Sequence, residues 1–177
     1  MSINIIHITG AAGAGTTTLG KAMSEKFGHL HFDTDDFFWE QTDPPFTQKR
    51  EIEKRQEQLK RAMDRAQKCV ISGSLTEWGD VFIHRFDLVI YVFAPTEIRL
   101  KRLQEREFQR FGNRILPDGD MFEEHQAFIK WAGQYDTGGV DICSALHHQQ
   151  WLKHVACPVV RVDGTASIEA MLQAIDV

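Results

Sequence analysis

The sequence predicts a three-layer α/β fold, with a parallel sheet of about five strands covered by helices on both faces. Short apolar runs rich in β-branched residues recur along the chain, and each ends in loop residues. Charged segments with helical spacing separate these runs. Since this alternation is typical of parallel sheets, we expect ligands to bind at the carboxyl ends of the strands.

The predicted elements follow from this alternation. Residues 3–9 (INIIHIT) form an apolar run that enters a glycine cluster, which predicts a buried strand and a tight loop. Residues 17–27 favour a helix that Gly28 ends, and 30–32 predict a short strand before an acidic cluster. The other predicted strands are 69–72, 88–93 and 159–162; the other predicted helices are 48–68, 96–111, 120–131 with Asp120 as N-cap, 144–154 and one from about 167; and the predicted loops or turns are 42–47, 112–119 and 163–164.

Composition limits the function classes. With 177 residues, of which 42% are hydrophobic and 25% charged, we expect one domain over residues 1–177. The net charge of −5 gives no support to binding of long nucleic acid. No apolar run is long enough to span a membrane and no signal peptide is recognisable, so we expect a cytoplasmic protein without a membrane partner.

Cysteine and histidine residues give no clear metal pattern. Cys69, Cys143 and Cys157 are widely spaced and contain no CxxC pair, which favours reduced thiols in the core. The pair His147 and His148 lacks carboxylate or cysteine partners at ligand spacing, and we expect a solvated helix surface there.

The glycine cluster contains the strongest motif. The segment Gly10 to Thr17 (GAAGAGTT) matches the phosphate-binding spacing GxxxxGK[ST], between a predicted strand and a predicted helix. Backbone N–H groups of such a loop and the N-terminus of the following helix bind phosphate oxygens. This P-loop predicts binding of a nucleoside triphosphate. The predicted binding residues here are Gly10, Ala11, Ala12, Gly13, Ala14, Gly15, Thr16, Thr17 and Thr18.

One residue of the motif departs from the pattern. Thr16 stands where the lysine is expected, while the hydroxyl of Thr17 remains available to ligate Mg²⁺. The lysine normally follows charge that develops on the outer phosphates during transfer. Either another cation takes this place, with Arg106, Arg110 and Arg114 as candidates, or the protein binds nucleotide and turns it over poorly.

A dinucleotide-binding loop is the competing interpretation. Gly13 and Gly15 are followed by Asp33 at a suitable distance, but the third glycine position holds Thr18. Neither Tyr91 nor Tyr135 has a lysine four residues later, so the pair expected for hydride transfer is missing. These departures disfavour a nicotinamide-dependent enzyme.

Beyond the loop, the chain resembles the nucleoside-monophosphate kinase superfamily, which includes adenylate, shikimate and gluconate kinases. Asp33-Thr34-Asp35 follows the second predicted strand, where these kinases often place acidic residues that bind the acceptor hydroxyl or Mg²⁺. The resemblance implies catalytic roles for Asp33 and Asp35, with Thr17 and Asp35 as metal ligands. The alternative is that Asp35 or Asp36 is only a helix N-cap.

The helix 96–111 is similar to the adenylate kinase helix that leads into the lid. Arg102, Arg106 and Arg110 share one face of it. The resemblance implies that Arg106 lies against adenine and the triphosphate, and that Arg110 and Arg114 contact the transferring phosphate. Arginine can bind phosphate through two parallel hydrogen bonds. Alternatively, these arginines form a surface stripe paired with Glu105 and Glu107.

Other segments carry the resemblance less specifically. Residues 162–165 (VDGT) are similar to the adenine-binding turn of adenylate kinases, which implies that Gly164 approaches the base. By the same resemblance, residues of about 106–135 form a lid-like segment and residues of about 36–68 lie on the acceptor side.

The acceptor-side segment differs from the named kinases. It contains the aromatic run 37–39 and the basic pair Lys49 and Arg50. Aromatic rings there either stack on a planar acceptor or form core under a flap, and Lys49 or Arg50 can hold a phosphate or carboxylate. The sequence is therefore compatible with three classes of phosphate acceptor: a nucleotide, a nucleoside or a small polar metabolite.

The leading hypothesis is an ATP-dependent kinase with Mg²⁺ that phosphorylates a small molecule. The alternative is a nucleotide-binding sensor that lost catalysis together with the lysine. The sequence does not decide between ATP and GTP, and it carries no signal for oligomeric state.

Overall fold

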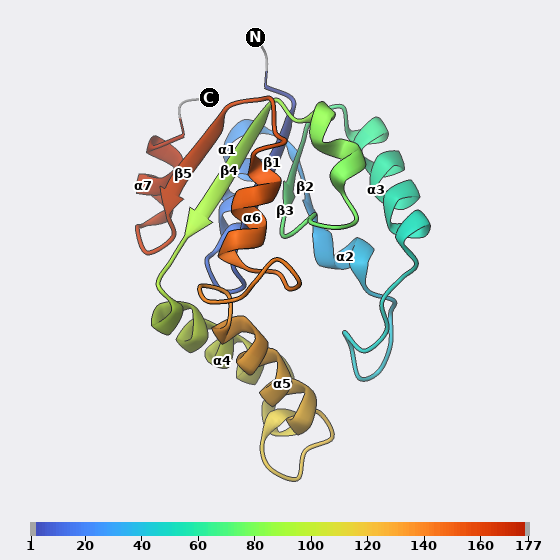
Figure 1. The fold of residues 1–177 in the computed structure, drawn as a ribbon, viewed down its shortest axis with the longest axis vertical. Coiled ribbons are helices and arrows are strands. Elements are labelled where there is room, and N and C mark those ends of the chain that lie inside the picture. The colour runs from blue at the N-terminus through green and yellow to red at the C-terminus, as the bar shows by residue number, and fades with distance from the viewer. Residues whose placement is uncertain (1–2, 176–177) are drawn as a thin grey trace.

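The computed structural model describes residues 3–175 and contains one five-stranded sheet in the order β2-β3-β1-β4-β5 (Figure 1). Every pair of neighbouring strands is parallel, so the carboxyl ends of all strands lie at one edge. The α/β fold class predicted from the alternation is confirmed. The strands are β1 (Ile5–Gly10), β2 (Leu30–Asp33), β3 (Cys69–Ser72), β4 (Leu88–Phe93) and β5 (Val159–Asp163).

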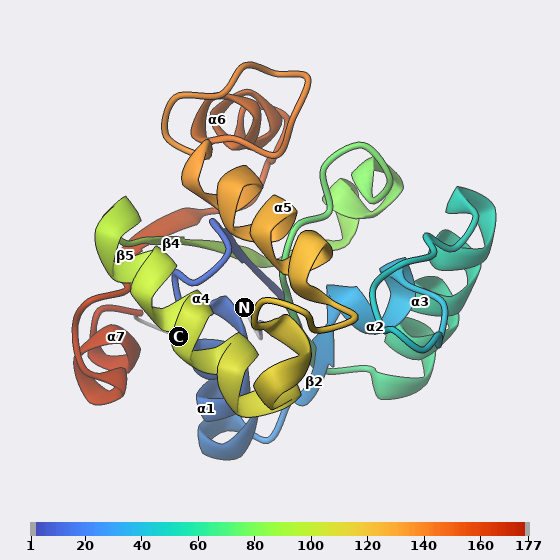
Figure 2. The same ribbon diagram turned by 90° about the horizontal axis from the view of Figure 1, so that it is seen from below.

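Helices cover both faces of the sheet, and Figure 2 looks onto the carboxyl edge with α4 and α5 in front. On one face, α1 and α7 pack on β1 and β4 through Leu19, Met23 and Met171. On the other, α3 and α6 pack through Leu59 and Trp151. The helices are α1 (Thr16–Phe27), α2 (Thr34–Phe38), α3 (Ile52–Ala66), α4 (Thr96–Phe111), α5 (Phe122–Gly133), α6 (Ala145–Leu152) and α7 (Ile168–Gln173), with 3₁₀ helices η1 (Asp80–Arg85) and η2 (Gly112–Ile115).

Two element predictions were wrong at their boundaries. Residues 48–51 are not part of α3, because Lys49 forms an antiparallel bridge with Trp39 and the Arg50 N–H donates to the Phe38 carbonyl at 2.8 Å. Asp120 is not the N-cap of α5, whose cap residue is Met121. The Asp120 carboxylate instead accepts hydrogen bonds from Arg114.

The short elements α2, η1 and η2 were not predicted. The η2 helix occupies the start of the segment expected to be a loop, and α2 follows β2 directly. All three are too short to give a hydrophobic period that a sequence pattern can reveal.

The histidine prediction was wrong for His148, which lies in the interior with no exposed surface. Its Nδ1 is 2.7 Å from the Tyr135 hydroxyl, and Nε2 is 3.1 Å from the Ser74 hydroxyl, so neutral partners satisfy both ring nitrogens. Burial, with a smaller contribution from His147, lowers the pKa of His148 to about 4.

The three cysteines are free thiols, as predicted, although only Cys69 is fully buried and the other two are partly exposed. Between residues 3 and 175, no helix is both long and apolar enough to cross a membrane.

Candidate nucleotide-binding site

The predicted P-loop connects the carboxyl end of β1 to the N-terminus of α1. Gly13 and Gly15 adopt positive φ values of 81° and 106°, a conformation that side chains disfavour. The Ala14 N–H donates to the Ala11 carbonyl at 3.0 Å and closes the turn between them. The two glycines therefore stand where the backbone must reverse around a concavity.

The donors of this loop are directed at no protein acceptor. Within residues 3–175, the N–H groups of Gly13, Gly15, Thr16, Thr17 and Thr18 form no hydrogen bond. The Gly15 N-cap of α1 also has no side-chain cap, so the first turn of the helix keeps its free amides. Free amides at a helix N-terminus form an anion-binding site, because the helix dipole adds partial positive charge.

Two glycines allow other elements to touch the loop. A Cβ on Gly13 would lie 2.6 Å from the Arg99 carbonyl of α4. A Cβ on Gly164 would lie 2.2 Å from the Ala14 carbonyl. The turn after β5 is thus packed directly on the P-loop, which is a structural requirement for Gly164 in addition to the predicted role beside adenine.

Two arginines of α4 contact backbone carbonyls of the P-loop and of the turn after β5. Arg102 Nη1 donates to the Gly164 carbonyl at 2.9 Å and lies 3.5 Å from the Gly13 carbonyl. Arg99 Nη1 lies 3.4 Å from the Ala12 carbonyl. Both guanidinium groups bind carbonyl oxygens, and neither occupies the position of Thr16.

Arg106 and Arg110 follow on the same helix. Arg106 forms an ion pair with Glu107 at 3.0 Å, so part of the surface-stripe alternative is observed for it. Arg110 forms no hydrogen bond or ion pair with residues 3–175, yet its charge and that of Arg106 both lower the pKa of Asp35. The two arginines therefore face the acidic cluster after β2.

Arg114 forms ion pairs with two acidic side chains. Its Nη2 lies 2.6 Å from Asp120 Oδ2 and 2.8 Å from Asp43 Oδ1. This pair connects the predicted lid-like segment to the loop on the acceptor side. A phosphate contact by Arg114 would require the guanidinium to leave both carboxylates.

Asp33 is the acidic residue that joins the P-loop. Its Oδ2 accepts a hydrogen bond from the Thr17 hydroxyl at 2.9 Å, and Oδ1 accepts from the Asp35 N–H at 3.1 Å. Asp33 is therefore the N-cap of α2, the place the N-cap alternative gave to Asp35 or Asp36. The hydrogen bond of the Thr17 hydroxyl goes to Asp33 and not to Asp35, its partner in the predicted metal pair.

Asp35 has an unusual proton affinity. The residue is exposed, but protein surrounds its carboxyl closely enough that desolvation, together with Asp33 and Asp36, raises its pKa from 3.8 to about 6. Arg106 and Arg110 oppose this rise. A carboxyl with such a pKa can exchange a proton near neutral pH.

The donor atoms present suit Mg²⁺. Residues 3–175 contain no group of three or more histidine, cysteine or acidic side chains arranged around a metal. Mg²⁺ does not require such a cage, because it is usually bound by one or two protein oxygens together with substrate phosphates and water. The Thr17 hydroxyl and the Asp33 carboxylate supply these oxygens beside the P-loop.

Arg50 and Arg55, on the acceptor side, make different contacts. Arg50 Nη1 donates to the carbonyls of Asp36 and Phe37, and Nε is 3.3 Å from Glu40, so this arginine holds α2 in place. Arg55 lies with its guanidinium 3.9 Å from the centre of the Phe38 ring. Sequence reasoning had proposed Arg50 for an acceptor anion and had not singled out Arg55.

The family of the chain follows from sequence comparison. A family model described as an AAA domain matches residues 6–115, which include the P-loop, Asp33 and the helix α4. The chain belongs to this AAA domain family of P-loop proteins. An uncharacterized protein of Bacillus subtilis, YqaC, is 40% identical over 163 residues, which cover 92% of this chain and 90% of that protein.

Other relatives of this AAA domain protein are kinases. The cytidylate kinase of Archaeoglobus fulgidus is 32% identical over 113 residues, which cover 58% of this chain and 61% of that enzyme. Among solved structures, the shikimate kinase of Bacteroides thetaiotaomicron has a TM-score of 0.59 at 18% identity, covering 97% of this chain and 96% of that one. A gluconokinase of Sinorhizobium meliloti has a TM-score of 0.53 at 12% identity, covering 97% and 88%.

These comparisons support the P-loop small-molecule kinase family that the resemblance implied, through the family match, the partial similarity to a cytidylate kinase and the fold shared with a shikimate kinase. They do not assign its site residues. Sequence reasoning missed the contacts of Arg99 and Arg102, although their spacing on α4 places both on the side that meets the P-loop.

Proposed function

We propose that the protein is an ATP-dependent kinase that transfers the γ-phosphoryl group of ATP to a small molecule. The observation that carries this proposal is the P-loop with free amides, joined through Thr17 to Asp33. The kinase relatives support the same reaction class. Transfer breaks the bond between the γ-phosphorus and its bridging oxygen, forms a bond to an acceptor oxygen and releases ADP.

Each part of the site has a role in this proposal. The loop amides bind the β- and γ-phosphates, and Thr17 and Asp33 would hold Mg²⁺, which neutralises phosphate charge. Asp35 is ionised above about pH 6, and it would accept the proton when the acceptor atom is a hydroxyl; a phosphate oxygen of a nucleoside monophosphate carries no proton to remove. Arg106 and Arg110 approach the transferring group in place of the missing lysine, and Arg114 joins them after it leaves Asp43 and Asp120.

The acceptor is proposed to be a nucleoside monophosphate or another small anion. The matched part of the cytidylate kinases supports testing nucleotides first. Lys49, which is exposed with its Nζ 5.7 Å from the centre of the Phe38 ring, is the candidate for binding the acceptor's anionic group, because Arg55 is buried and its Nε donates to the Arg50 carbonyl. Nucleosides and sugar acids remain in the panel because the acceptor-side aromatics suit several planar or polar molecules.

The experiment is a screen for ATP consumption over nucleoside monophosphates, nucleosides, shikimate and gluconate, with Mg²⁺ present. We expect turnover with one acceptor class and none in a variant with Gly15→Val, whose φ of 106° is unfavourable for valine. ATP binding without turnover on any acceptor would contradict the kinase proposal.

The second candidate function is a nucleotide-binding sensor. Thr16 favours it, because the group that follows charge during transfer is missing. Saturable nucleotide binding, no turnover and a shift in thermal stability on binding would be its signature.

A further inference from the structure

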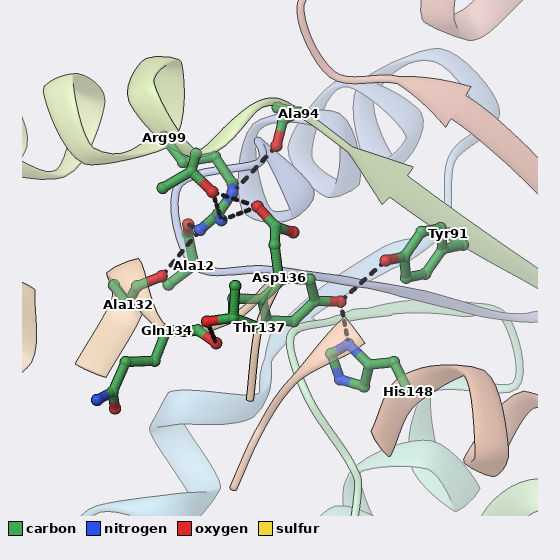
Figure 3. Close-up of polar contacts among 11 residues, drawn as sticks. Ala12, Tyr91, Ala94, Arg99, Ala132, Gln134, Asp136, Thr137 and His148 are labelled. Carbon is green, nitrogen blue, oxygen red and sulfur yellow. Dashed lines mark hydrogen bonds and ion pairs between the residues drawn. The ribbon is translucent and has the colours of Figure 1, made fainter. Parts of the chain in front are cut away.

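Arg99 is a buried cation directly behind the P-loop. The residue has no exposed surface, its guanidinium donates hydrogen bonds to several oxygen acceptors (Figure 3), and its Cζ lies 5.2 Å from the centre of the Tyr135 ring. Nε donates to the Ala94 carbonyl at 3.0 Å, and Nη1 donates to the Ala132 carbonyl at 3.1 Å. Nη1 is also within 3.4 Å of the Ala12 carbonyl, and Nη2 binds Thr96 and Asp136.

The contact with Ala12 bears on the orientation of one phosphate-binding donor. In a planar trans peptide, the carbonyl and the N–H of the next residue point in opposite directions. Arg99 attracts the Ala12 carbonyl toward α4 and α5, so the Gly13 N–H points away from Arg99. That N–H forms no hydrogen bond within residues 3–175, which leaves it available to a phosphate.

The charge of Arg99 is incompletely balanced inside the protein. Among the described residues 3–175, its ion-pair partner is Asp136 at 3.1 Å, whose side chain is 39% exposed whereas that of Arg99 is 0% exposed. Solvent screens an exposed charge more than a buried one. The remaining partners are a hydroxyl and carbonyl dipoles, so a positive potential persists on the side of the P-loop.

We propose that Arg99 is a positioning residue for triphosphate binding, which orients the Ala12–Gly13 peptide and supplies from behind the loop part of the positive charge that Thr16 lacks in front. This inference rests on the proposed nucleotide-binding function. It differs from the assignment of Arg106 and Arg110, because Arg99 is covered by protein and acts through the loop rather than by touching the phosphates.

The test compares two variants with opposite predicted effects. Arg99→Met removes the cation, and we expect the Kd for MgATP to rise about tenfold, as for loss of a charge-assisted hydrogen bond. Asp136→Asn keeps an acceptor for Arg99 and Thr96 but removes the counter-charge. Its Kd should fall, and the fall should be larger at low salt. A merely structural role would weaken binding in both variants.

A lysine in the P-loop provides a second readout. Thr16→Lys should improve MgATP binding more in the Arg99→Met background than in the wild type, because the added charge replaces the one removed. Equal improvement in both backgrounds would contradict the charge contribution of Arg99.

Folding is followed by circular dichroism and thermal unfolding in every variant. If Arg99→Met does not fold, Asp136→Asn decides, and unchanged or weaker MgATP binding by a folded Asp136→Asn protein overturns the proposal. Unchanged binding by a folded Arg99→Met protein also overturns it. Absence of MgATP binding by the wild type would instead refute the proposed function itself.

Discussion

The nucleotide side and the acceptor side of the sheet edge present different groups to a ligand. On the nucleotide side, free backbone amides of the P-loop form the site, while Arg99 and Arg102 bind carbonyls behind it. On the acceptor side, side chains dominate, with the Asp33 to Asp36 cluster and the exposed Lys49 beside the Phe38 ring.

This difference predicts how each side responds to substitution. A backbone site is insensitive to many side-chain changes but fails when a bulky group alters the loop. A side-chain site responds to changes of charge and pH. The missing lysine removes little from the first kind of site, which explains how a P-loop with Thr16 can keep its binding geometry.

The largest expected effect is on the backbone side. Gly13→Val places a branched side chain at a φ of 81° and against the Arg99 carbonyl, which a Cβ would approach to 2.6 Å. We expect calorimetric titration to detect no MgATP binding. The matched control is Gly133→Ala at the end of α5, where a Cβ meets only Leu100 at 3.7 Å. Full binding by the Gly13→Val protein would contradict the backbone site.

A large effect is also expected where the two sides meet. Asp33→Ala removes the acceptor of the Thr17 hydroxyl and the N-cap of α2. We expect kcat/KM to fall by about 100-fold and the free energy of unfolding by about 1 kcal/mol. The neighbouring Asp36→Asn variant is the control, because Asp36 does not contact Thr17. If the two variants lost kcat/KM equally, activity would depend on the total charge of the acidic cluster and not on the contact between Asp33 and Thr17.

A pH effect is expected from Asp35. Because its pKa in the folded protein is about 6, kcat/KM should rise about tenfold per pH unit below that value and level off above it. The raised pKa also means that ionisation costs stability as pH rises from about 4 to 6. The Asp35→Asn variant should therefore have a higher Tm than the wild type at pH 7, and this difference should be smaller at pH 4. The same variant should show no turnover. A pH-independent difference in Tm would show that Asp35 titrates normally.

Much of the nucleotide side could be predicted from the sequence. The strands were recognisable because buried parallel strands are continuous apolar runs, and the loop because its glycine spacing is tied to backbone geometry. The pairing of Thr17 with Asp33 was harder to predict, because three acidic residues lie within four positions at the end of β2 and the start of α2, and spacing alone does not select one.

The roles of Arg99, His148 and Lys49 could not be predicted from the sequence, because they depend on tertiary contacts. Arg99 was assigned no role from the sequence, because its partners are carbonyls of three segments that are separate in the sequence. His148 was misjudged for the same reason, since its partners Tyr135 and Ser74 are distant in sequence or on another element. The predicted helix 48–68 begins later than expected, because Lys49 forms an antiparallel bridge with Trp39 instead of a first helical turn.

The most direct test of the central claim is a calorimetric comparison of ATP, ADP and AMP binding to the wild-type protein with Mg²⁺. A loop whose amides bind the β- and γ-phosphates should bind ATP most tightly, ADP more weakly because it lacks the γ-phosphate, and AMP at least tenfold more weakly than ATP. AMP binding as tight as ATP binding, or no binding of any of the three, would contradict a working P-loop.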